Sequence, residues 1–301
     1  MHLKLFSILI LFIHLLSCND STTPFPPELV HFTPSPHNPI FKGTGSPTDW
    51  DEIIRERGYI LKEDGIYHMW YTGYNNALNA QMKLGYATSP DGMTWTRYAG
   101  NPIFDSVWTE DMMVIKVGDT YQMFAEGKGD IAHRLTSQDR IHWTEQGSLN
   151  IRKVNGQSIS PGPYGTPSVI LEDSVYYLFY ERNDSAVWLA KSIDLLTWTN
   201  VQEDPVLIKG PESYDRYGIA MNQVIRYQGK YYGYYHGTPD KDWSTWNTNV
   251  AVSEDKIHWR KYAHNPILED NKSSGIIVQD GDQIRMYTMH PEVCVHDAIK
   301  K

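Results

Sequence analysis

Short segments rich in aromatic and apolar residues recur along the chain, at residues 67–71, 121–125, 176–180, 231–235 and 284–289. The first shows the full unit, because a β-rich segment and a polar turn precede it and a second apolar segment follows it. Short apolar segments bounded by turn residues are typical of β-strands. The pattern therefore predicts an all-β fold built from five similar antiparallel units.

Each of the first four units ends in the same heptad, Ser-x-Asp-x-x-x-Trp, whose last residues are Trp95, Trp143, Trp198 and Trp259. These tryptophans are 48, 55 and 61 residues apart. Such spacing is typical of four-stranded propeller blades with their loops. The sequence predicts a five-bladed β-propeller in which the heptad tryptophans pack between strands.

A second short repeat, Asn-Pro-Ile followed by Phe or Leu, indicates how the ring closes. It follows two of the heptads, at residues 101–104 and 265–268, but one copy at residues 38–41 precedes the first blade. The fifth unit, conversely, has no heptad. We therefore predict that residues 28–41 supply the outer strand of the fifth blade, so that no sheet edge stays open between the first and last blades.

The first 18 residues are typical of a targeting segment, with Lys4 followed by an apolar stretch too short for an ordinary membrane-spanning helix. The residues Leu-Leu-Ser-Cys that follow resemble the lipobox of bacterial lipoproteins, which implies lipidation of Cys18. The alternative is an ordinary secretory signal peptide. We predict a lipid anchor at the bacterial cell envelope, in the periplasm or on the outer-membrane surface, as the only membrane contact. The predicted divisions are a signal peptide at 1–18, a tether at 19–27 and the propeller at 28–301.

Composition narrows the range of partners and chemistries. The formal net charge is −9 and no run of Lys or Arg occurs, which argues against nucleic acid as a partner. Once Cys18 is assigned only Cys294 remains, so the mature chain forms no internal disulfide, and apolar neighbours predict that Cys294 is a packed strand residue. No zinc motif, nucleotide-binding loop or Gly-x-Ser-x-Gly elbow occurs.

The functional site is expected where the blades converge, because the inner strand of each blade starts, and the next strand ends, at one rim of the central funnel. The second strands end at Thr72, Glu126, Glu181, His236 and His290. The inner strands start near the acids Asp51, Glu56, Glu110, Asp111 and Asp215. Cleavage of a glycosidic bond needs two carboxyl groups, one to protonate the leaving oxygen and one to activate water or attack carbon. The alternative is that these are solvated strand-end residues.

Other residues near the rim have the chemistry of sugar binding. The arginine fork suits a carboxylate or sulfate on an acidic sugar, and an aromatic face stacks on a sugar ring. The alternative for the arginines is that they only pair with adjacent acids. The predicted substrate-binding residues are Arg57, Glu126, Trp108, Tyr164, Asp215, Arg216, Trp246 and His290.

The sequences YHMWYTGY at residues 67–74 and LGYATSPDGMTWTRYAGNPIF at residues 84–104, with the later heptads, resemble the five-bladed propeller glycosidases related to glycoside hydrolase families 43, 32, 117 and 130. Asp111 resembles the Asp of the Arg-Asp-Pro motif of family 32, and family 117 tolerates a His near the acid, which makes His236 a candidate. The chain departs from the pattern where it lacks the first Asn-Asp-Pro and reads Gly-Thr-Pro at residues 165–167 in place of Glu-Cys-Pro.

The resemblance implies a glycoside hydrolase, inverting and exo-acting, on a plant or algal oligosaccharide or polysaccharide. Retention is predicted instead if the working carboxyl groups lie about 5 Å apart. Glu56 or Asp51 is then the base, Asp111 the modulator, and Glu181 the acid, with Glu126 and His236 as the other candidates for the acid. The alternatives are a non-catalytic glycan-binding surface lipoprotein and a phosphorylase related to family 130, which needs a basic pocket for phosphate. No cofactor is required, although His236, His290 and His296 are candidates to hold a divalent cation near the axis.

Overall fold

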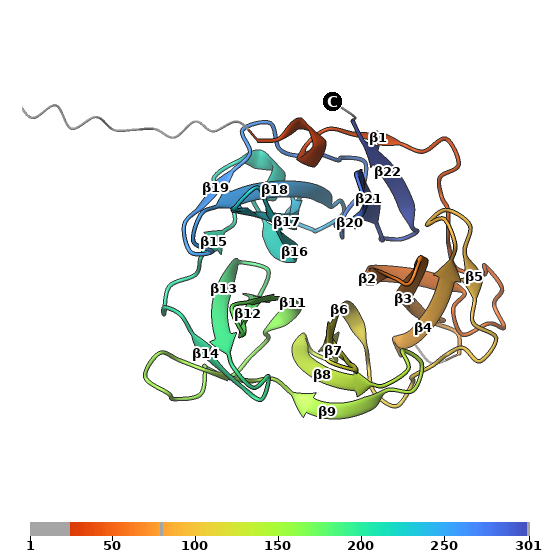
Figure 1. Ribbon diagram of the computed structural model, residues 1–301, viewed down its shortest axis with the longest axis horizontal. Coiled ribbons are helices and arrows are strands. Elements are labelled where there is room, and N and C mark those ends of the chain that lie inside the picture. The colour runs from red at the N-terminus through yellow and green to blue at the C-terminus, as the bar shows by residue number, and fades with distance from the viewer. Residues whose placement is uncertain (1–24, 79–80, 300–301) are drawn as a thin grey trace, which may run out of the picture.

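Five antiparallel sheets surround a central axis, as the repeats predict, and the chain runs around the ring from blade to blade (Figure 1). The computed structural model describes residues 25–78 and 81–299. The predicted signal peptide, its lipidated Cys18 and most of the tether at residues 19–27 lie outside the described residues. Within the part of the chain that is described, no helix is both long and apolar enough to span a membrane.

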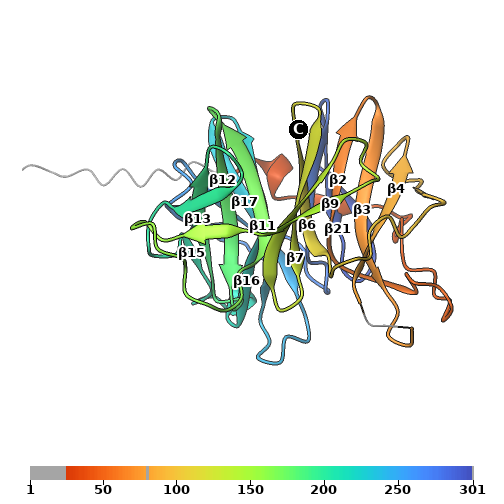
Figure 2. The same ribbon diagram turned by 90° about the horizontal axis from the view of Figure 1, so that it is seen from below.

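Strands in the first two blades follow one another from the axis outward. The first blade contains β2 (Ile53–Glu63), β3 (Ile66–Tyr74), β4 (Lys83–Ser89) and β5 (Thr96–Arg97). The second contains β6 (Glu110–Val117), β7 (Thr120–Gly127), β8 (Ile131–Ser137) and β9 (Thr144–Ser148). The inner strands β2 and β6 are in contact and stand upright beside the axis (Figure 2).

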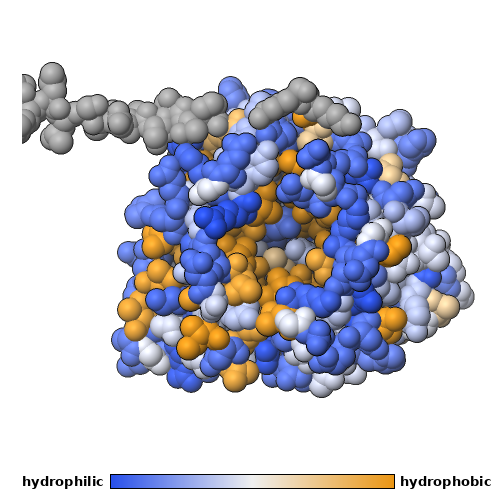
Figure 3. Space-filling view, viewed as in Figure 1, coloured by the Kyte–Doolittle hydropathy of each residue, from blue (hydrophilic) through white to orange (hydrophobic). Residues whose placement is uncertain are grey.

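The third and fourth blades repeat this order with small additions. The third contains β11 (Gly165–Glu172), β12 (Val175–Arg182), β13 (Ala186–Ser192) and β14 (Thr197–Asn200), extended by β10 (Asn150–Arg152) and β15 (Leu207–Ile208). The fourth contains β16 (Gly218–Tyr227), β17 (Lys230–Thr238), β18 (Asn247–Ser253) and β19 (Trp259–Lys261), and the 3-10 helix η2 (Ser213–Asp215) precedes it. Along the axis the surface is hollowed at the centre, with apolar residues around the hollow (Figure 3).

The fifth blade combines the two ends of the described chain. It contains β20 (Ile276–Asp280), β21 (Gln283–Thr288), β22 (Cys294–Ala298) and the N-terminal β1 (Phe32–Pro34), which follows the 3-10 helix η1 (Pro27–Leu29). The predicted closure by residues 28–41 is confirmed, because β1 pairs antiparallel with β22. Asn38 extends this pairing: its Oδ1 accepts from the Val295 backbone N–H at 2.8 Å and its Nδ2 donates to the Val295 carbonyl at 2.9 Å.

The heptads join neighbouring blades. In the second heptad, Asp139 Oδ1 accepts the backbone N–H groups of Ile141 and His142, which fixes the turn that presents the tryptophan. Trp143 then packs edge-on against Trp70 of the preceding blade, with ring centroids 6.0 Å apart. Trp198 and Trp259 pack in the same way against aromatic rings of their preceding blades. These three tryptophans pack against strands, as the sequence predicted, and the strands belong to neighbouring blades.

Candidate functional site

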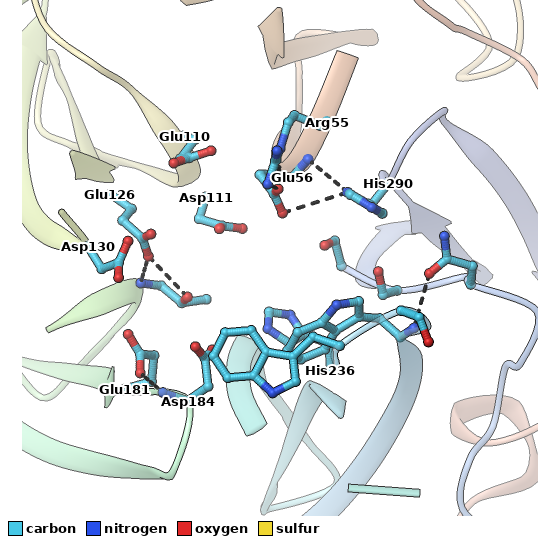
Figure 4. Close-up of a pocket in the computed structure, with 17 residues that line it drawn as sticks. Arg55, Glu56, Glu110, Asp111, Glu126, Asp130, Glu181, Asp184, His236 and His290 are labelled. Carbon is cyan, nitrogen blue, oxygen red and sulfur yellow. Dashed lines mark hydrogen bonds and ion pairs between the residues drawn. The ribbon is translucent and has the colours of Figure 1, made fainter. Parts of the chain in front are cut away.

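A cavity of about 470 Å³ lies where the five blades converge, and its lining comes from all of them (Figure 4). Its charged side chains are seven acids and one base: Glu56, Glu110, Asp111, Glu126, Asp130, Glu181, Asp184 and Arg55. The rest of the lining is polar or aromatic, and consists of Thr166, His236, Trp243, Ser244, Trp246, Asn271, Ser273, Ser274 and His290. This acidic cavity is the candidate site and is called the central pocket below.

The inner strands reach the central pocket through β-bulges. The pairing register shifts near the pocket end of β2, β6, β11 and β16. Glu56, Asp111 and Thr166 lie within three of these shifts and have positive φ angles of 60°, 45° and 42°. Non-glycine residues rarely adopt this conformation, and it persists where the surrounding structure holds it, often at functional sites. The bulges thus direct Glu56 and Asp111 toward the axis at the cost of local strain.

Arg57 is fully buried and does not line the central pocket. Its guanidinium donates to the backbone carbonyls of Met221, Asn222, Asp111 and Pro167, which belong to three other blades. Its backbone N–H donates to Asp111 Oδ1 at 2.9 Å. Arg57 therefore ties four blades together, and its positive charge interacts with Asp111 and Glu126. It does not line the pocket, where the sequence predicted that it binds substrate.

Glu126 and Glu181 converge on Gly165. Glu126 Oε2 accepts the Thr166 backbone N–H at 2.7 Å, and Glu181 Oε1 accepts the Gly165 backbone N–H at 3.1 Å. A Cβ at Gly165 would lie 2.1 Å from Glu126 Oε2 and 2.9 Å from Glu181 Oε1. Since both oxygen atoms lie within 3 Å of one point, they are within about 5 Å of each other. Only glycine leaves room for both carboxyl groups here.

Burial raises the pKa of several pocket carboxyl groups, and mutual repulsion adds to the effect. Burial and then Asp111 raise the pKa of Glu56 to about 7, although its ion pair with Arg55 opposes the shift. Burial and then the nearest acids raise the pKa of Glu110 and Glu181 to about 8. The same causes raise the pKa of Asp184 to about 7. Protonated and ionised carboxyl groups therefore coexist in the pocket near neutral pH.

Two neutral imidazoles face the carboxylates from the fourth and fifth blades. Burial lowers the pKa of His236 to about 3 and also lowers the pKa of His290. His236 Nδ1 lies 2.8 Å from the Oδ1 of buried Asn222, so it carries the hydrogen and leaves Nε2 as an acceptor. His290 Nδ1 accepts the Glu56 backbone N–H at 3.3 Å, so its hydrogen is on Nε2. The pair offers a ligand one acceptor and one donor.

Several residues predicted for the site do line the central pocket. Some lie at the ends of second strands, others at the starts of the inner strands of the first two blades, and one in a loop. These residues are Glu56, Asp111, Glu126, Glu181, His236, Trp246 and His290. Trp246 stacks edge-on against His236, with ring centroids 4.9 Å apart. Strand position alone thus indicated much of the acidic lining.

Asp51 and Asp215 lie outside the central pocket and have structural partners. Asp51 Oδ2 accepts from Tyr71 Oη at 3.0 Å and from Arg97 Nε at 3.0 Å. Asp215 is completely buried and forms an ion pair with Lys261. Each acid holds its inner strand to the outer strands of its own blade. We therefore leave both out of the chemistry that we propose.

Three further residues predicted to bind substrate also lie outside the lining. The Trp108 indole N–H donates to Glu110 Oε1, so this ring supports a pocket acid from behind. Tyr164 Oη donates to the Leu149 carbonyl at 3.3 Å. Arg216 is exposed at the end of η2, where its backbone N–H donates to Ser213. Loop geometry, which the sequence pattern does not show, decides these positions.

Asp130 and Asp184 line the pocket but were not predicted. Both lie in the turns that join the second strand of a blade to the third, β7 to β8 and β12 to β13. Asp130 has a φ of 58° and Asp184 a φ of 47°. A signal was available, because each follows a predicted pocket glutamate by three or four residues. The turns beyond the strand ends therefore contribute to the pocket together with the strand ends themselves.

No metal centre is formed by the described residues, among which no group of three or more His, Cys, Asp or Glu side chains could hold a metal ion. His296, predicted as a possible third ligand, points elsewhere: its Nε2 lies 3.4 Å from Thr288 Oγ1 within the fifth blade. Cys294 is buried and free in β22, as expected for a packed strand residue.

Comparisons with known proteins agree with this architecture. The model of the glycosyl hydrolases family 32 N-terminal domain matches residues 166–285. The uncharacterized protein MT1551 of Mycobacterium tuberculosis (strain CDC 1551 / Oshkosh) is 26% identical over 221 residues, which cover 67% of this chain and 73% of that protein. A 1,2-beta-oligomannan phosphorylase of Thermoanaerobacter sp. (strain X514) is 23% identical over 250 residues, covering 73% and 77% respectively.

Among solved structures, a glycosyl hydrolase from Bacteroides ovatus superposes with a TM-score of 0.73 at 16% identity, covering 91% of this chain and 95% of that one. The chain thus has the five-bladed propeller fold found in glycoside hydrolases and in related phosphorylases. The resemblance to the propeller glycosidases that the sequence indicated is confirmed.

Proposed function

We propose that the protein is a glycoside hydrolase that uses two carboxyl groups of the central pocket. One observation supports this most strongly: carboxyl groups of raised pKa line a pocket of about 470 Å³, so an acid and a base are both available near neutral pH. The strained backbone at Glu56 and Asp111 also favours a catalytic role for the pocket over simple binding of a glycan.

Glu181 is the proposed general acid, because its pKa of about 8 keeps it protonated at neutral pH. Glu56 is the proposed base, and Asp111 orients the substrate from its position between them. His236 is not proposed as the acid, since a pKa of about 3 leaves it without a proton to give. Glu56 and Glu181 face each other across the pocket (Figure 4), which suits a water molecule between base and sugar and hence inversion. A pocket supplied by all five blades suits exo-action.

The rate should have a narrow optimum between about pH 7 and pH 8. Above pH 8 the acid Glu181 loses its proton, and below pH 7 the base Glu56 gains one, so the rate falls on both sides. Because the pocket acids interact, the apparent pKa values on the two sides of the pH profile describe the titration of the whole cluster and not of single residues. A profile of kcat/KM from pH 5 to pH 9 tests this, and a rate that stays constant across that range would contradict the assignment.

Replacing Gly165 by alanine should lower kcat at least about tenfold, because the new Cβ displaces the carboxyl group of Glu126 or Glu181. Gly118 is a control for a Cβ added away from the pocket, since it lies in the β6–β7 turn and a Cβ there would meet nothing within 4 Å. Its φ of 59° strains alanine, so this variant should lose stability. Gly118→Ala should leave kcat unchanged. Steady-state kinetics and thermal unfolding of both variants separate a local effect from unfolding, and full activity of Gly165→Ala would exclude these two acids from catalysis.

Phosphorolysis is the second candidate, since one relative is a phosphorylase. The lining favours hydrolysis, because Arg55 is its only basic side chain and is paired with Glu56. Turnover of aryl glycosides and oligosaccharides, β-1,2-mannobiose included, should be compared with and without inorganic phosphate. We expect free sugar to be released at the same rate with and without phosphate. A requirement for phosphate, with sugar 1-phosphate as product, would replace hydrolysis by phosphorolysis.

A further inference from the structure

The loop that joins β17 to β18 is longer than its counterparts in the two preceding blades. It runs over residues 239–246, whereas the corresponding loops of the second and third blades are residues 128–130 and 183–185. Hairpin loops usually contain about two to five residues, and longer ones often serve a function. The loop projects past the neighbouring strand ends (Figure 2), and its Trp243, Ser244 and Trp246 line the central pocket. We call residues 239–246 the Trp243 loop.

Asp240 fixes the conformation of the Trp243 loop. Its Oδ2 accepts the hydroxyl group of Ser244 at 3.0 Å and that of Thr245. Its backbone carbonyl accepts the Trp243 backbone N–H at 3.1 Å, and its own N–H donates to Thr238 Oγ1 at 3.1 Å. These hydrogen bonds hold the loop in one conformation before a ligand binds.

Within this loop Trp243 is both strained and exposed. Its φ is 58°, a left-handed conformation that bulky residues rarely adopt and that is found mostly at functional sites. The residue is 45% exposed, so its indole keeps apolar surface in water that a ligand with an apolar face would cover. The strain and the exposure are separate observations, and both indicate that this indole is placed to bind a ligand.

A series of aromatic rings leads from Trp243 into the pocket. The indoles of Trp243 and Trp246 meet edge-on with ring centroids 5.9 Å apart, and Trp246 meets His236 in the same way at 4.9 Å. The Trp246 backbone N–H also donates to Asn271 Oδ1 at 3.0 Å, which joins the loop to the start of the fifth blade. Trp243 is exposed, Trp246 is partly buried and His236 is buried. Trp243 therefore lies at the mouth of the pocket.

We propose that Trp243 binds the sugar on the leaving-group side of the scissile bond, by stacking its indole on the ring of that sugar. This deepens the proposed function and rests on it. In an exo-acting pocket the terminal sugar fills the enclosed end, so the leaving group lies at the mouth, where Trp243 is exposed. One face of a sugar ring carries C–H groups and packs on an aromatic face. The preferred substrate is therefore an oligosaccharide, whose leaving group is a sugar ring.

The surroundings of Trp243 fit a sugar better than an apolar partner. Its neighbours in the loop are polar and exposed: Lys241, Asp242, Ser244 and Thr245. Apolar patches that bind a membrane or another protein cover roughly several hundred Å², which is more than one indole supplies. A sugar presents an apolar face to the indole and hydroxyl groups to the polar neighbours.

Substrates that share a terminal sugar but differ in the leaving group give a matched test. A glycosyl fluoride releases a fluoride ion and places no ring at the mouth, whereas a disaccharide places one there. Both anomers of the fluorides of glucose, galactose, mannose, xylose and arabinose are compared with disaccharides that end in the same sugar. Trp243→Ala should lower kcat/KM for the disaccharide about tenfold, the scale of one stacking contact, and change that for the fluoride less than about twofold.

Two further variants separate stacking from other effects. Trp243→Phe keeps an aromatic face and should keep most of the kcat/KM for the disaccharide. Tyr98→Ala removes another exposed ring, which meets Tyr86 edge-on with ring centroids 6.3 Å apart but does not line the central pocket. It should leave both kcat/KM values unchanged. Thermal unfolding of each variant ensures that the rates refer to folded protein.

The proposal is overturned if Trp243→Ala affects both substrates equally or affects neither, or if a fluoride is cleaved and no disaccharide is. In each of these cases cleavage by the parent protein still supports the hydrolase. If nothing is cleaved, the proposed hydrolase is wrong, and calorimetry of the same full-length proteins decides this inference. A disaccharide must then bind more tightly than its terminal monosaccharide, and Trp243→Ala must remove that difference. Any other calorimetric result overturns the stacking site.

Discussion

Replacing Arg57 by methionine is expected to destabilise the folded protein by about 3–5 kcal/mol, the scale of breaking a buried charged network. The guanidinium is fully buried and bonds carbonyl groups of three other blades, so methionine leaves these acceptors without donors. It also removes a positive charge that interacts with Asp111 and Glu126. Denaturant unfolding of the variant measures the loss directly.

Arg216→Met is the matched control, because Arg216 is exposed. That change should alter the free energy of unfolding by no more than about 0.5 kcal/mol. A loss below about 1 kcal/mol in Arg57→Met would show that the blades do not depend on this central arginine. If the Arg57 variant does not fold at all, Arg57→Lys provides the measurement, since it keeps the charge but loses most of the carbonyl contacts.

Replacing Glu181 by glutamine is expected to lower kcat at least about a hundredfold, the lower end of what general acid catalysis contributes. The amide cannot protonate the leaving oxygen. Both carboxyl oxygens accept backbone N–H groups, from Gly165 at 3.1 Å and Asp184 at 2.6 Å, so the new NH₂ group faces one of these donors. We therefore also expect a loss of about 1–3 kcal/mol in the free energy of unfolding.

Activity and unfolding of Glu181→Gln must be measured on the same preparation, so that the loss of rate refers to folded protein. Glu254→Gln is the control, because Glu254 is an exposed acid that pairs with Lys230 and does not line the central pocket. It should keep both activity and stability. Retention of more than a tenth of the parental kcat by folded Glu181→Gln would exclude Glu181 as the acid.

The ring and its closure were predictable because they depend on local patterns. The heptad recurs in four blades, and the extra Asn-Pro-Ile before the first blade marks a strand that belongs elsewhere. The Asn38 side chain accepts the backbone N–H of Val295, just as the Asn101 side chain accepts the backbone N–H of Tyr86. A motif that makes the same backbone contacts in each blade has the same sequence in each, so repetition identifies it. The lipid attachment at Cys18 stays a prediction, because it lies outside the described residues.

The site was predictable only in part, because strand ends indicate a rim but not which side chains turn inward. Asp51 illustrates this: it bonds Tyr71 and Arg97, which follow it by 20 and 46 residues. Asp215 bonds Tyr235 and Lys261 at the same spacings. That shared spacing was visible in the sequence and indicates a structural repeat, whereas pocket residues differ between blades.

Arg57 could not have been placed from the sequence. Its position depends on carbonyl groups contributed by residues 54 to 165 positions away, brought together only when the ring closes. The bulges at Glu56 and Asp111 are equally invisible, since a register shift of one or two residues leaves the strand pattern intact. Closure of the ring therefore determines the central pocket, while local sequence determines the blades.

The most direct test of the account is to follow the anomeric proton signals of an oligosaccharide or aryl glycoside panel by NMR, with the full-length protein in phosphate-free buffer. We expect that some substrate is cleaved and that the first product has the inverted anomeric configuration. Cleavage should stop in Asp111→Asn and Glu181→Gln. If no bond is cleaved, yet oligosaccharides bind the parent and both variants equally tightly, the central pocket is a binding site and the protein is not a hydrolase.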